Sequence, residues 1–276
     1  MRHSSDHQSA APPRIPDAAR IVPIPTAAPP PQSQTLRDAL IAASWTAPPR
    51  CAKRDGDAAT WLGDLVLQSA SLPVVLKRIP LRRGAAGFIQ RLLRRTRAER
   101  QSRGAALLTR ANIPCSRPIL LLRTPSHDHL LCERIPGPDA LHTLHPDSPT
   151  RPVAEQHAIA ARNGKSVRAL ADAGLVNRDH KLSNIILCAG ADIALVDTVA
   201  ITPSRHRDNA IHRMLAAMLF ESVGVELLPR RALRMRTLTA AVGRDGARAE
   251  WRRLAETLRA AGDTTPKINP LHDLPR

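Results

Sequence analysis

Short apolar runs separated by polar turns occupy the first half of the chain. Residues 62–68 and 73–78 are rich in β-branched and other apolar side chains, which predicts two strands. Residues 113–122 and 130–135 predict two further strands for the same reason. Between these pairs, residues 87–111 repeat apolar positions at helical spacing among many arginines, so we expect one Arg-rich helix there.

Helical spacing dominates the second half of the chain. Residues 152–173 predict a helix that has a proline in its first turn, and Gly174 stands where a C-terminal stop is expected. The apolar runs 185–187 and 193–196, joined by Ala-Gly-Ala-Asp, predict a β-hairpin, and helices are expected again from about residue 208. A small strand-rich part followed by a helix-rich part is typical of an α+β fold with two lobes and a cleft between them.

The two ends of the chain differ in composition from its centre. Ten of the 25 prolines lie within residues 1–50. Such a segment buries too little apolar surface to offset its chain entropy, so we expect it to be disordered. The expected folded domain spans residues 51–261, with a strand-rich N-lobe at about 51–135, a helical C-lobe at about 136–261 and a polar tail at 262–276.

Charge narrows the classes of partner. The chain has 276 residues and carries 41 Lys and Arg against 24 Asp and Glu, a formal net charge of +17. This excess favours phosphate groups, nucleic acid or an acidic membrane surface. A nucleic-acid-binding protein is one alternative, but stacking platforms for bases need aromatic side chains, and the chain has two Phe, three Trp and no Tyr. Nucleic acid is therefore the less favoured partner.

Cysteine usage and hydropathy exclude other classes. The four cysteines form no C-x-x-C pair, which argues against a zinc ribbon or a disulfide framework and indicates reduced thiols in a cytoplasm. No run of eighteen apolar residues predicts a transmembrane helix, and the N-terminus lacks the apolar region of a secretion signal. We therefore expect a cytoplasmic protein.

The pattern with chemical content is Asn-Arg-Asp-His-Lys-Leu-Ser-Asn, from Asn177 to Asn184, followed thirteen residues later by Asp197. Phosphoryl transfer needs an acid that accepts the proton of the attacking hydroxyl, which suits Asp179, and a cation that offsets charge, which suits Lys181. It also needs oxygen ligands for Mg²⁺, and Asn184 and Asp197 can supply them. The alternative is an ordinary surface loop with a capping aspartate.

This pattern resembles the protein-kinase catalytic loop H-R-D-x-K-x-x-N and the aspartate that opens D-F-G. Upstream, residues 74–77 resemble the strand whose lysine, here Lys77, binds nucleotide, and Glu99 resembles the helix partner of that lysine. Glu133 ends a segment similar to the strand that enters the interlobe hinge, where backbone groups bind adenine. Over roughly residues 55–240 the chain resembles the bacterial lipopolysaccharide kinase group, the Kdo/heptose kinase family.

The resemblance implies a bilobal protein-kinase-like fold with a reduced helical C-lobe. It implies an enzyme that uses ATP and Mg²⁺ and phosphorylates a hydroxyl of a lipopolysaccharide-type or lipid-linked sugar, at the inner face of the cytoplasmic membrane. In this interpretation Lys77 holds the α- and β-phosphates and is fixed by Glu99. The implied site residues are catalytic Asp179 and Lys181, cofactor-binding Lys77, Glu99 and Glu133, and metal-binding Asn184 and Asp197.

Several departures from the kinase pattern keep other functions open. Asn177 replaces the usual His of the loop, Asp197 is followed by Thr-Val instead of Phe-Gly, and the chain has no A-P-E. Where a glycine-rich phosphate loop is expected, at about residues 54–67, only Gly56 and Gly63 occur. A pseudokinase that acts as a binding module is therefore one alternative, and a small atypical serine/threonine protein kinase is another.

A basic segment over residues 78–103 has two interpretations. It holds nine arginines against one acid, Glu99. One interpretation is an amphipathic helix that lies on anionic lipid or phosphorylated glycan. The other is the solvated face of the helix that carries Glu99, with the apolar residues packed inward. The apolar side chains that recur beside the arginines are Phe88, Ile89, Leu92 and Leu93.

Overall fold

The computed structural model describes residues 12, 14–26, 30–68, 70–144, 151–189, 192–224 and 230–260. The fold is α+β, as predicted, and divides into two compact units. Within the described residues, unit 1 comprises residues up to 106 together with 116–134, and unit 2 comprises 107–115 and 135–260. No helix in these described ranges is long and apolar enough to cross a bilayer.

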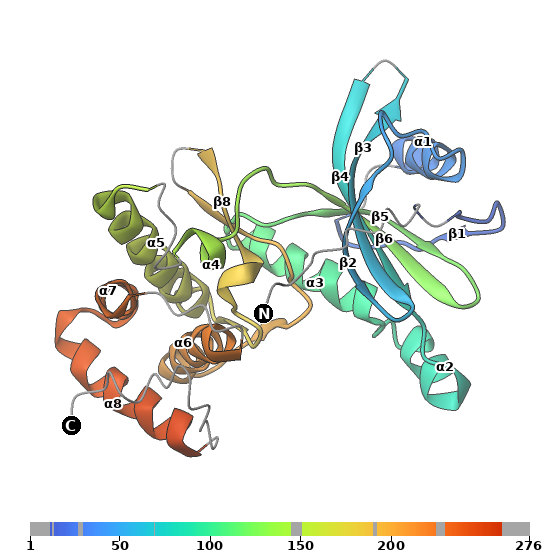
Figure 1. Ribbon diagram of the computed structural model, residues 1–276. Helices are drawn as coiled ribbons and strands as arrows, with labels where there is room; N and C mark the ends of the chain where they lie inside the picture. The colour runs from blue at the N-terminus through green and yellow to red at the C-terminus, as the bar shows by residue number, and fades with distance from the viewer. Residues whose placement is uncertain are drawn as a thin grey trace. The chain divides into compact units, whose positions relative to one another are not determined.

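Unit 1 is built on an antiparallel sheet of six strands in the order β1-β5-β6-β4-β3-β2 (Figure 1). The predicted strands appear as β3 to β6, with shifted ends. In β3 alternate residues are buried, as expected for a strand with one covered face. The strands are β1 (Arg20–Ile21), β2 (Arg50–Asp55), β3 (Ala58–Leu67), β4 (Ala70–Pro80), β5 (Pro118–Arg123) and β6 (His127–Glu133).

Both faces of the sheet are covered at its centre, which explains the nearly continuous burial of β5 and β6. Leu120 and Leu122 pack into an apolar cluster with α1 (Pro30–Ile41). Leu121 points to the other face, where it packs with Ala98 of α3 (Arg97–Arg110). Alternation along one strand therefore supplies the two separate apolar clusters of unit 1.

The prediction of disorder for residues 1–50 is wrong for the described part of that segment. Helix α1 lies along the sheet of unit 1 (Figure 1), and its Leu36 and Leu40 are buried there together with Ile15 and Ala19. The side chain of Arg37 also donates a hydrogen bond to Ala19 O at 3.2 Å. Burial against the sheet compensates for the proline-rich composition. Residues 1–11 lie outside the described residues.

The single helix predicted over residues 87–111 is two helices, α2 (Gly84–Leu92) and α3. Arg94, between them, has φ +51°, a left-handed conformation that ends a helix. A new helix then begins with a capping box. The Oγ1 of Thr96 accepts the N–H of Glu99 at 3.3 Å, and Oε2 of Glu99 accepts the N–H of Thr96 at 3.0 Å.

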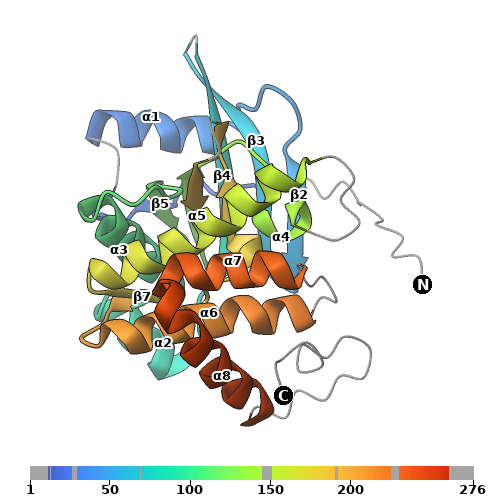
Figure 2. The ribbon, with the colours of Figure 1, turned by 90° about the vertical axis from the view of Figure 1, so that its left-hand side faces the viewer.

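Unit 2 is mainly helical, and its helices α5, α6 and α7 lie side by side in Figure 2. Gly164 allows α5 and α7 to approach closely, because a Cβ there would lie 2.0 Å from Thr237 O. The helices are α4 (Ala140–Thr143), α5 (Val153–Asp172), α6 (Arg207–Gly224), α7 (Arg231–Val242) and α8 (Arg244–Ala260).

Two small antiparallel ladders complete unit 2. Strand β7 (Leu175–Asn177) pairs with β10 (Ile201–Pro203), and β8 (Ile185–Leu187) pairs with β9 (Ile193–Leu195). The predicted hairpin and the predicted helix over 152–173 are thus present, and Gly174 follows that helix with φ +67°. The ladder β7–β10 was not predicted. The tail at 262–276 lies outside the described residues.

One segment belongs to a different unit than expected. Residues 107–115 were assigned to the N-lobe, but they cluster with unit 2. Leu108 is fully buried in the apolar core of unit 2. The backbone of Cys115 forms an isolated β-bridge with Leu195 of β9. The expected lobe boundary near residue 135 and the division after Arg134 differ by one residue.

Candidate active site

The candidate site is the loop between β7 and the 3₁₀ turn η1 (Leu182–Asn184). Strand β7 ends at Asn177, which is fully buried and whose Oδ1 accepts the N–H of Asp179 at 3.1 Å. Just beyond the paired residues of β7 and β10, the N–H of Arg178 donates to Ala200 O at 3.3 Å. Asn177, at the position where the kinase pattern has a histidine, therefore holds the backbone of Asp179 through a side-chain turn.

Three polar side chains of the loop converge on one another. Nζ of Lys181 lies 2.8 Å from Oδ1 of Asp179. Nδ2 of Asn184 donates to the carbonyl oxygen of Asp179 at 3.1 Å and approaches its Oδ2 at 3.4 Å. The spacing D-x-K-x-x-N thus folds into one cluster. Because the ion pair is more than one third exposed, it contributes little to stability, and its significance is chemical.

The hairpin β8–β9 brings the chain at Asp197 back beside Asn184. The register pairs Ile185 with Leu195, and the N–H of Val196 donates to Asn184 O at 3.0 Å. Asp197 itself is half-buried, and its Oδ1 accepts the N–H of Val199 at 3.4 Å. The two expected metal ligands therefore come from adjacent points of one hairpin.

The oxygen donors at this point fit Mg²⁺, which prefers carboxylate, amide and phosphate oxygens. Nδ2 of Asn184 donates a hydrogen bond to Asp179, and Oδ1 is the side-chain oxygen that a cation could use. Asp197 adds a carboxylate. In the part of the chain that the structure describes, no cluster of three or more His, Cys, Asp or Glu could hold a metal. A cation here would need further oxygens from a bound phosphate or water.

An open hollow of about 590 Å³ lies next to the cluster, within unit 2. Loop residues form one part of it, and residues of α6 and α8 form the rest. Three of the lining side chains are cationic, against one carboxylate. The lining residues are Arg178, Asp179, Lys181, His212, Arg213, Ala216, Ala217 and Thr257.

The helical wall of this hollow contains a histidine held at both ring nitrogens. Nδ1 of His212 lies 2.6 Å from Oε1 of Glu250, and Nε2 lies 2.9 Å from Oγ1 of Thr257. Thr257 in turn donates to Arg253 O at 3.1 Å. Sequence reasoning missed this wall, because α6 and α8 meet only through tertiary packing and neither carries a motif.

A second histidine belongs to the loop itself. His180 is fully buried, and burial lowers the pKa of its imidazole to about 4. Its Nε2 has no hydrogen-bond partner among the described residues, and its Nδ1 lies 3.5 Å from Nδ2 of Asn177. The imidazole is therefore buried in its neutral form and carries no charge near pH 7.

The expected ion pair between Lys77 and Glu99, both in unit 1, is not formed. Nζ of Lys77 on β4 instead lies 3.2 Å from Oε1 of Gln101, two residues further along α3. The other end of the Gln101 amide approaches Sγ of Cys132 at 3.8 Å. Glutamine is the missed residue of this part of the site. The sequence could not distinguish Gln101 from Glu99 as the partner of Lys77, because both residues lie in the first two turns of α3.

Glu99 instead belongs to a buried cluster at the start of α3. It caps the helix through Thr96, and its Oε1 lies 3.5 Å from Nη2 of Arg123. The guanidinium of Arg123 also makes a two-point bond to Asp128, with distances of 2.7 and 3.0 Å. Asp128 is completely buried, so Arg123 balances two carboxylates. The role of Glu99 is therefore to anchor α3 to the β5–β6 hairpin.

Glu133 is also engaged within unit 1. Its N–H donates to Arg117 O at 2.9 Å, and its carbonyl accepts from Oγ of Ser116 at 2.7 Å. The side chain pairs with Arg117 at 2.5 Å. The next N–H, of Arg134, donates to Pro73 O at 3.1 Å. A base could use the N–H groups of Glu133 and Arg134 only by displacing these bonds.

The two glycines of the expected phosphate loop have different roles. Gly56 has φ +54° and lies in the two-residue turn between β2 and β3, in open space. Gly63 lies within β3, where a Cβ would come within 3.0 Å of Pro49 and Trp45. Gly56 therefore allows the tight turn of the hairpin, and Gly63 allows Pro49 and Trp45 to pack closely against β3.

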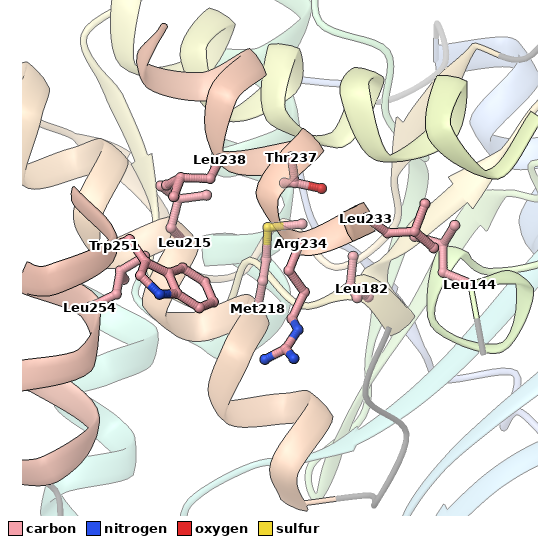
Figure 3. Close-up of a pocket in the computed structure, with 10 residues that line it drawn as sticks. All are labelled: Leu144, Leu182, Leu215, Met218, Leu233, Arg234, Thr237, Leu238, Trp251 and Leu254. Atoms are coloured by element: carbon pink, nitrogen blue, oxygen red, sulfur yellow. The ribbon is translucent and has the colours of Figure 1, made fainter. Parts of the chain in front are cut away.

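A separate small cavity in unit 2 lies behind the loop. Its volume is about 40 Å³, room for little more than a water-sized group, and its walls are almost entirely apolar (Figure 3). Leu182 of η1 and Met218 of α6 contribute to it, and the guanidinium of Arg234 lies 5.9 Å from the ring centre of Trp251. We interpret it as a packing feature beneath η1.

Comparison with protein-family models and with curated proteins finds no match for this chain.

Proposed function

We propose that this protein is a kinase-like enzyme that transfers the γ-phosphoryl group of ATP to a hydroxyl, with Mg²⁺. The observation that carries the proposal is the cluster of Asp179, Lys181 and Asn184, with Asp197 beside it on the hairpin. A carboxylate, an ammonium group and two oxygen ligands are the groups that phosphoryl transfer uses. A protein-kinase-like fold is part of this proposal, supported by the α+β architecture and the position of the loop between β7 and η1.

Each polar residue of the site has a different role in the proposed phosphoryl transfer. Asp179 orients the acceptor hydroxyl and takes its proton, while Lys181 offsets negative charge on the transferred group. Asn184 and Asp197 hold the cation through Oδ1 and a carboxylate oxygen. When bound, Mg²⁺ supplies charge neutralisation at the phosphates. Lys77 of unit 1 binds phosphate oxygens, and Gln101 orients it.

The hollow beside Asp179 suits an acceptor with negative charge. Arg178, Lys181 and Arg213 line it, and they outnumber the single carboxylate. Guanidinium groups bind phosphate and carboxylate through paired hydrogen bonds. A phosphorylated or carboxylated sugar, as in lipopolysaccharide-type or lipid-linked glycans, has both this charge and free hydroxyls. We place the reaction at the inner face of the cytoplasmic membrane, as the resemblance implies.

A pseudokinase is the second candidate, and specific observations favour it. The partner of Lys77 is an uncharged amide, and the β2–β3 turn has two residues instead of a glycine-rich loop. Both features should weaken the binding of nucleotide phosphates relative to an active kinase. A small atypical serine/threonine protein kinase is a third candidate. The cationic hollow would suit only acidic peptides among the substrates of such a kinase.

One assay separates these candidates. Purified protein is incubated with radiolabelled ATP and Mg²⁺ in the presence of sugar phosphates, lipid-linked glycans or protein substrates. Transfer to an anionic glycan, lost in Asp179→Asn, would support the proposal. Binding of ATP with no transfer to any acceptor would support the pseudokinase, and transfer only to protein would support the third candidate.

A further inference from the structure

Helix α2 displays an apolar stripe on its surface. Phe88, Ile89, Leu92 and Leu93 are exposed by 60, 51, 69 and 53%. Among the described residues only two other large apolar side chains are exposed, Ile21 and Val153, and neither belongs to this helix. The interpretation in which the four residues pack inward is therefore wrong. A contiguous exposed apolar patch is typical of a surface that binds a membrane or a partner.

The stripe faces away from the body of unit 1. Gly87 is the buried residue of α2, and a Cβ there would lie 1.8 Å from Arg82 O, so this side is pressed against the preceding turn. At about 100° per residue, the four apolar positions centre roughly 170° from Gly87. Figure 1 shows α2 beyond the end of α3, away from the sheet of the same unit. Its apolar side is therefore open.

Positive charge borders the stripe at both ends. Arg82 and Arg83 precede the helix, Arg94 and Arg95 follow it, and all four are exposed. From residue 78 to residue 98 the sequence contains no acidic residue. The nearest acid, Glu99, is buried and engaged by Thr96 and Arg123, so it does not neutralise this surface.

We propose that α2 and its flanking arginines form a membrane-binding surface that lies on an anionic bilayer. An amphipathic helix with arginines beside an apolar face inserts its apolar side chains at the level of the headgroups, while the guanidinium groups pair with lipid phosphates. Charge complementarity selects anionic lipid over a neutral surface. The inference concerns unit 1 alone and does not depend on the proposed activity.

Vesicle sedimentation tests this surface. The full chain should sediment with vesicles of phosphatidylglycerol and phosphatidylcholine, far less with phosphatidylcholine alone, and progressively less as salt rises. Phe88→Ser with Leu92→Ser should weaken the association by about tenfold or more, because insertion of apolar surface is lost. Arg83→Gln with Arg95→Gln should do the same through lost charge. All four side chains are exposed, so the thermal midpoint should stay close to that of the wild type.

Matched controls use exposed residues of other helices. Val153→Ser on α5 removes exposed apolar surface, and Arg248→Gln with Arg252→Gln on α8 removes the same charge. Both should bind vesicles as the wild type does. No sedimentation at low salt, or equal sedimentation of the α2 variants and the controls, would overturn the proposal. So would concentration-dependent dimers that Phe88→Ser with Leu92→Ser abolishes, because the stripe would then be a contact between two copies.

Discussion

Nζ of Lys77 donates a hydrogen bond to Oε1 of Gln101 across 3.2 Å, so the partner of this lysine is an amide of α3. Glu99, two residues before Gln101, instead bonds to the N–H of Thr96 and pairs with Arg123. Residues two apart on a helix point in different directions, so only one of the two can face β4. An uncharged partner positions the ammonium group without neutralising it, which leaves its full charge for an anionic ligand.

This pairing can be measured by double-mutant cycles on the free energy of unfolding. Lys77→Met and Gln101→Leu should show a coupling of about 1 kcal/mol, because they remove the two ends of one charge-assisted hydrogen bond. Lys77→Met and Glu99→Gln should be additive within about 0.4 kcal/mol. Urea unfolding of the wild type and the variants supplies the values. A larger coupling of Lys77 with Glu99 would contradict the observed geometry.

Asp179 is the residue on which the proposed activity depends most. Asp179→Asn keeps the shape of the side chain but removes the base, so transfer to the acceptor should fall by about 10²–10⁴-fold. Binding of Mg·ATP, followed as a thermal shift, should change little. The matched control is Asp172→Asn, which removes an exposed ion pair with Arg207 in the same unit. Near-normal turnover of Asp179→Asn would exclude this residue as the base.

A separate prediction concerns Asp197, a proposed metal ligand. Asp197→Ala should abolish the part of the ATP-induced rise in melting temperature that depends on Mg²⁺, because binding to the folded state alone stabilises it. The measurement compares ATP with Mg²⁺ against ATP with a chelator. Asp192→Asn, at an exposed carboxylate beside the start of β9, is the control and should keep the full shift. An unchanged difference in Asp197→Ala would mean that the cation is held elsewhere.

His180 should make the stability of the protein depend on pH. The pKa of His180 is about 4 in the folded protein, and the ordinary pKa of a histidine is 6.5, so between these values the unfolded chain binds more protons than the folded one. Stability from this group is therefore present above about pH 6.5 and is lost as the pH falls toward 4. The full loss is about 3 kcal/mol, at 1.36 kcal/mol per pKa unit.

His180→Leu isolates that contribution, because leucine is neutral at every pH and removes a buried nitrogen without a hydrogen-bond partner among the described residues. Urea unfolding at a series of pH values should show a shallower fall in stability between pH 6.5 and 4 for the variant than for the wild type. Parallel curves would show that the imidazole titrates normally in the folded protein.

Local sequence patterns determined much of unit 2 and the loop. The helix α5 with Gly174 after it and the hairpin β8–β9 were both predicted. Each depends on residues within a few positions of one another, where periodicity and turn chemistry act directly. The cluster of Asp179, Lys181 and Asn184 follows from the same short range.

Contacts between distant segments decided the rest. The described part of the proline-rich segment before residue 50 packs against the sheet of unit 1, and its composition alone could not reveal that burial. The choice of Gln101 over Glu99 depends on how α3 is rotated against β4 and the β5–β6 hairpin. The hollow joins the loop to His212 and Thr257, which come from separate helices. Finally, the pattern of α2 fits an inward or an outward apolar face equally well, and only the exposure of Phe88 and Leu92 in the folded structure shows that the face is outward.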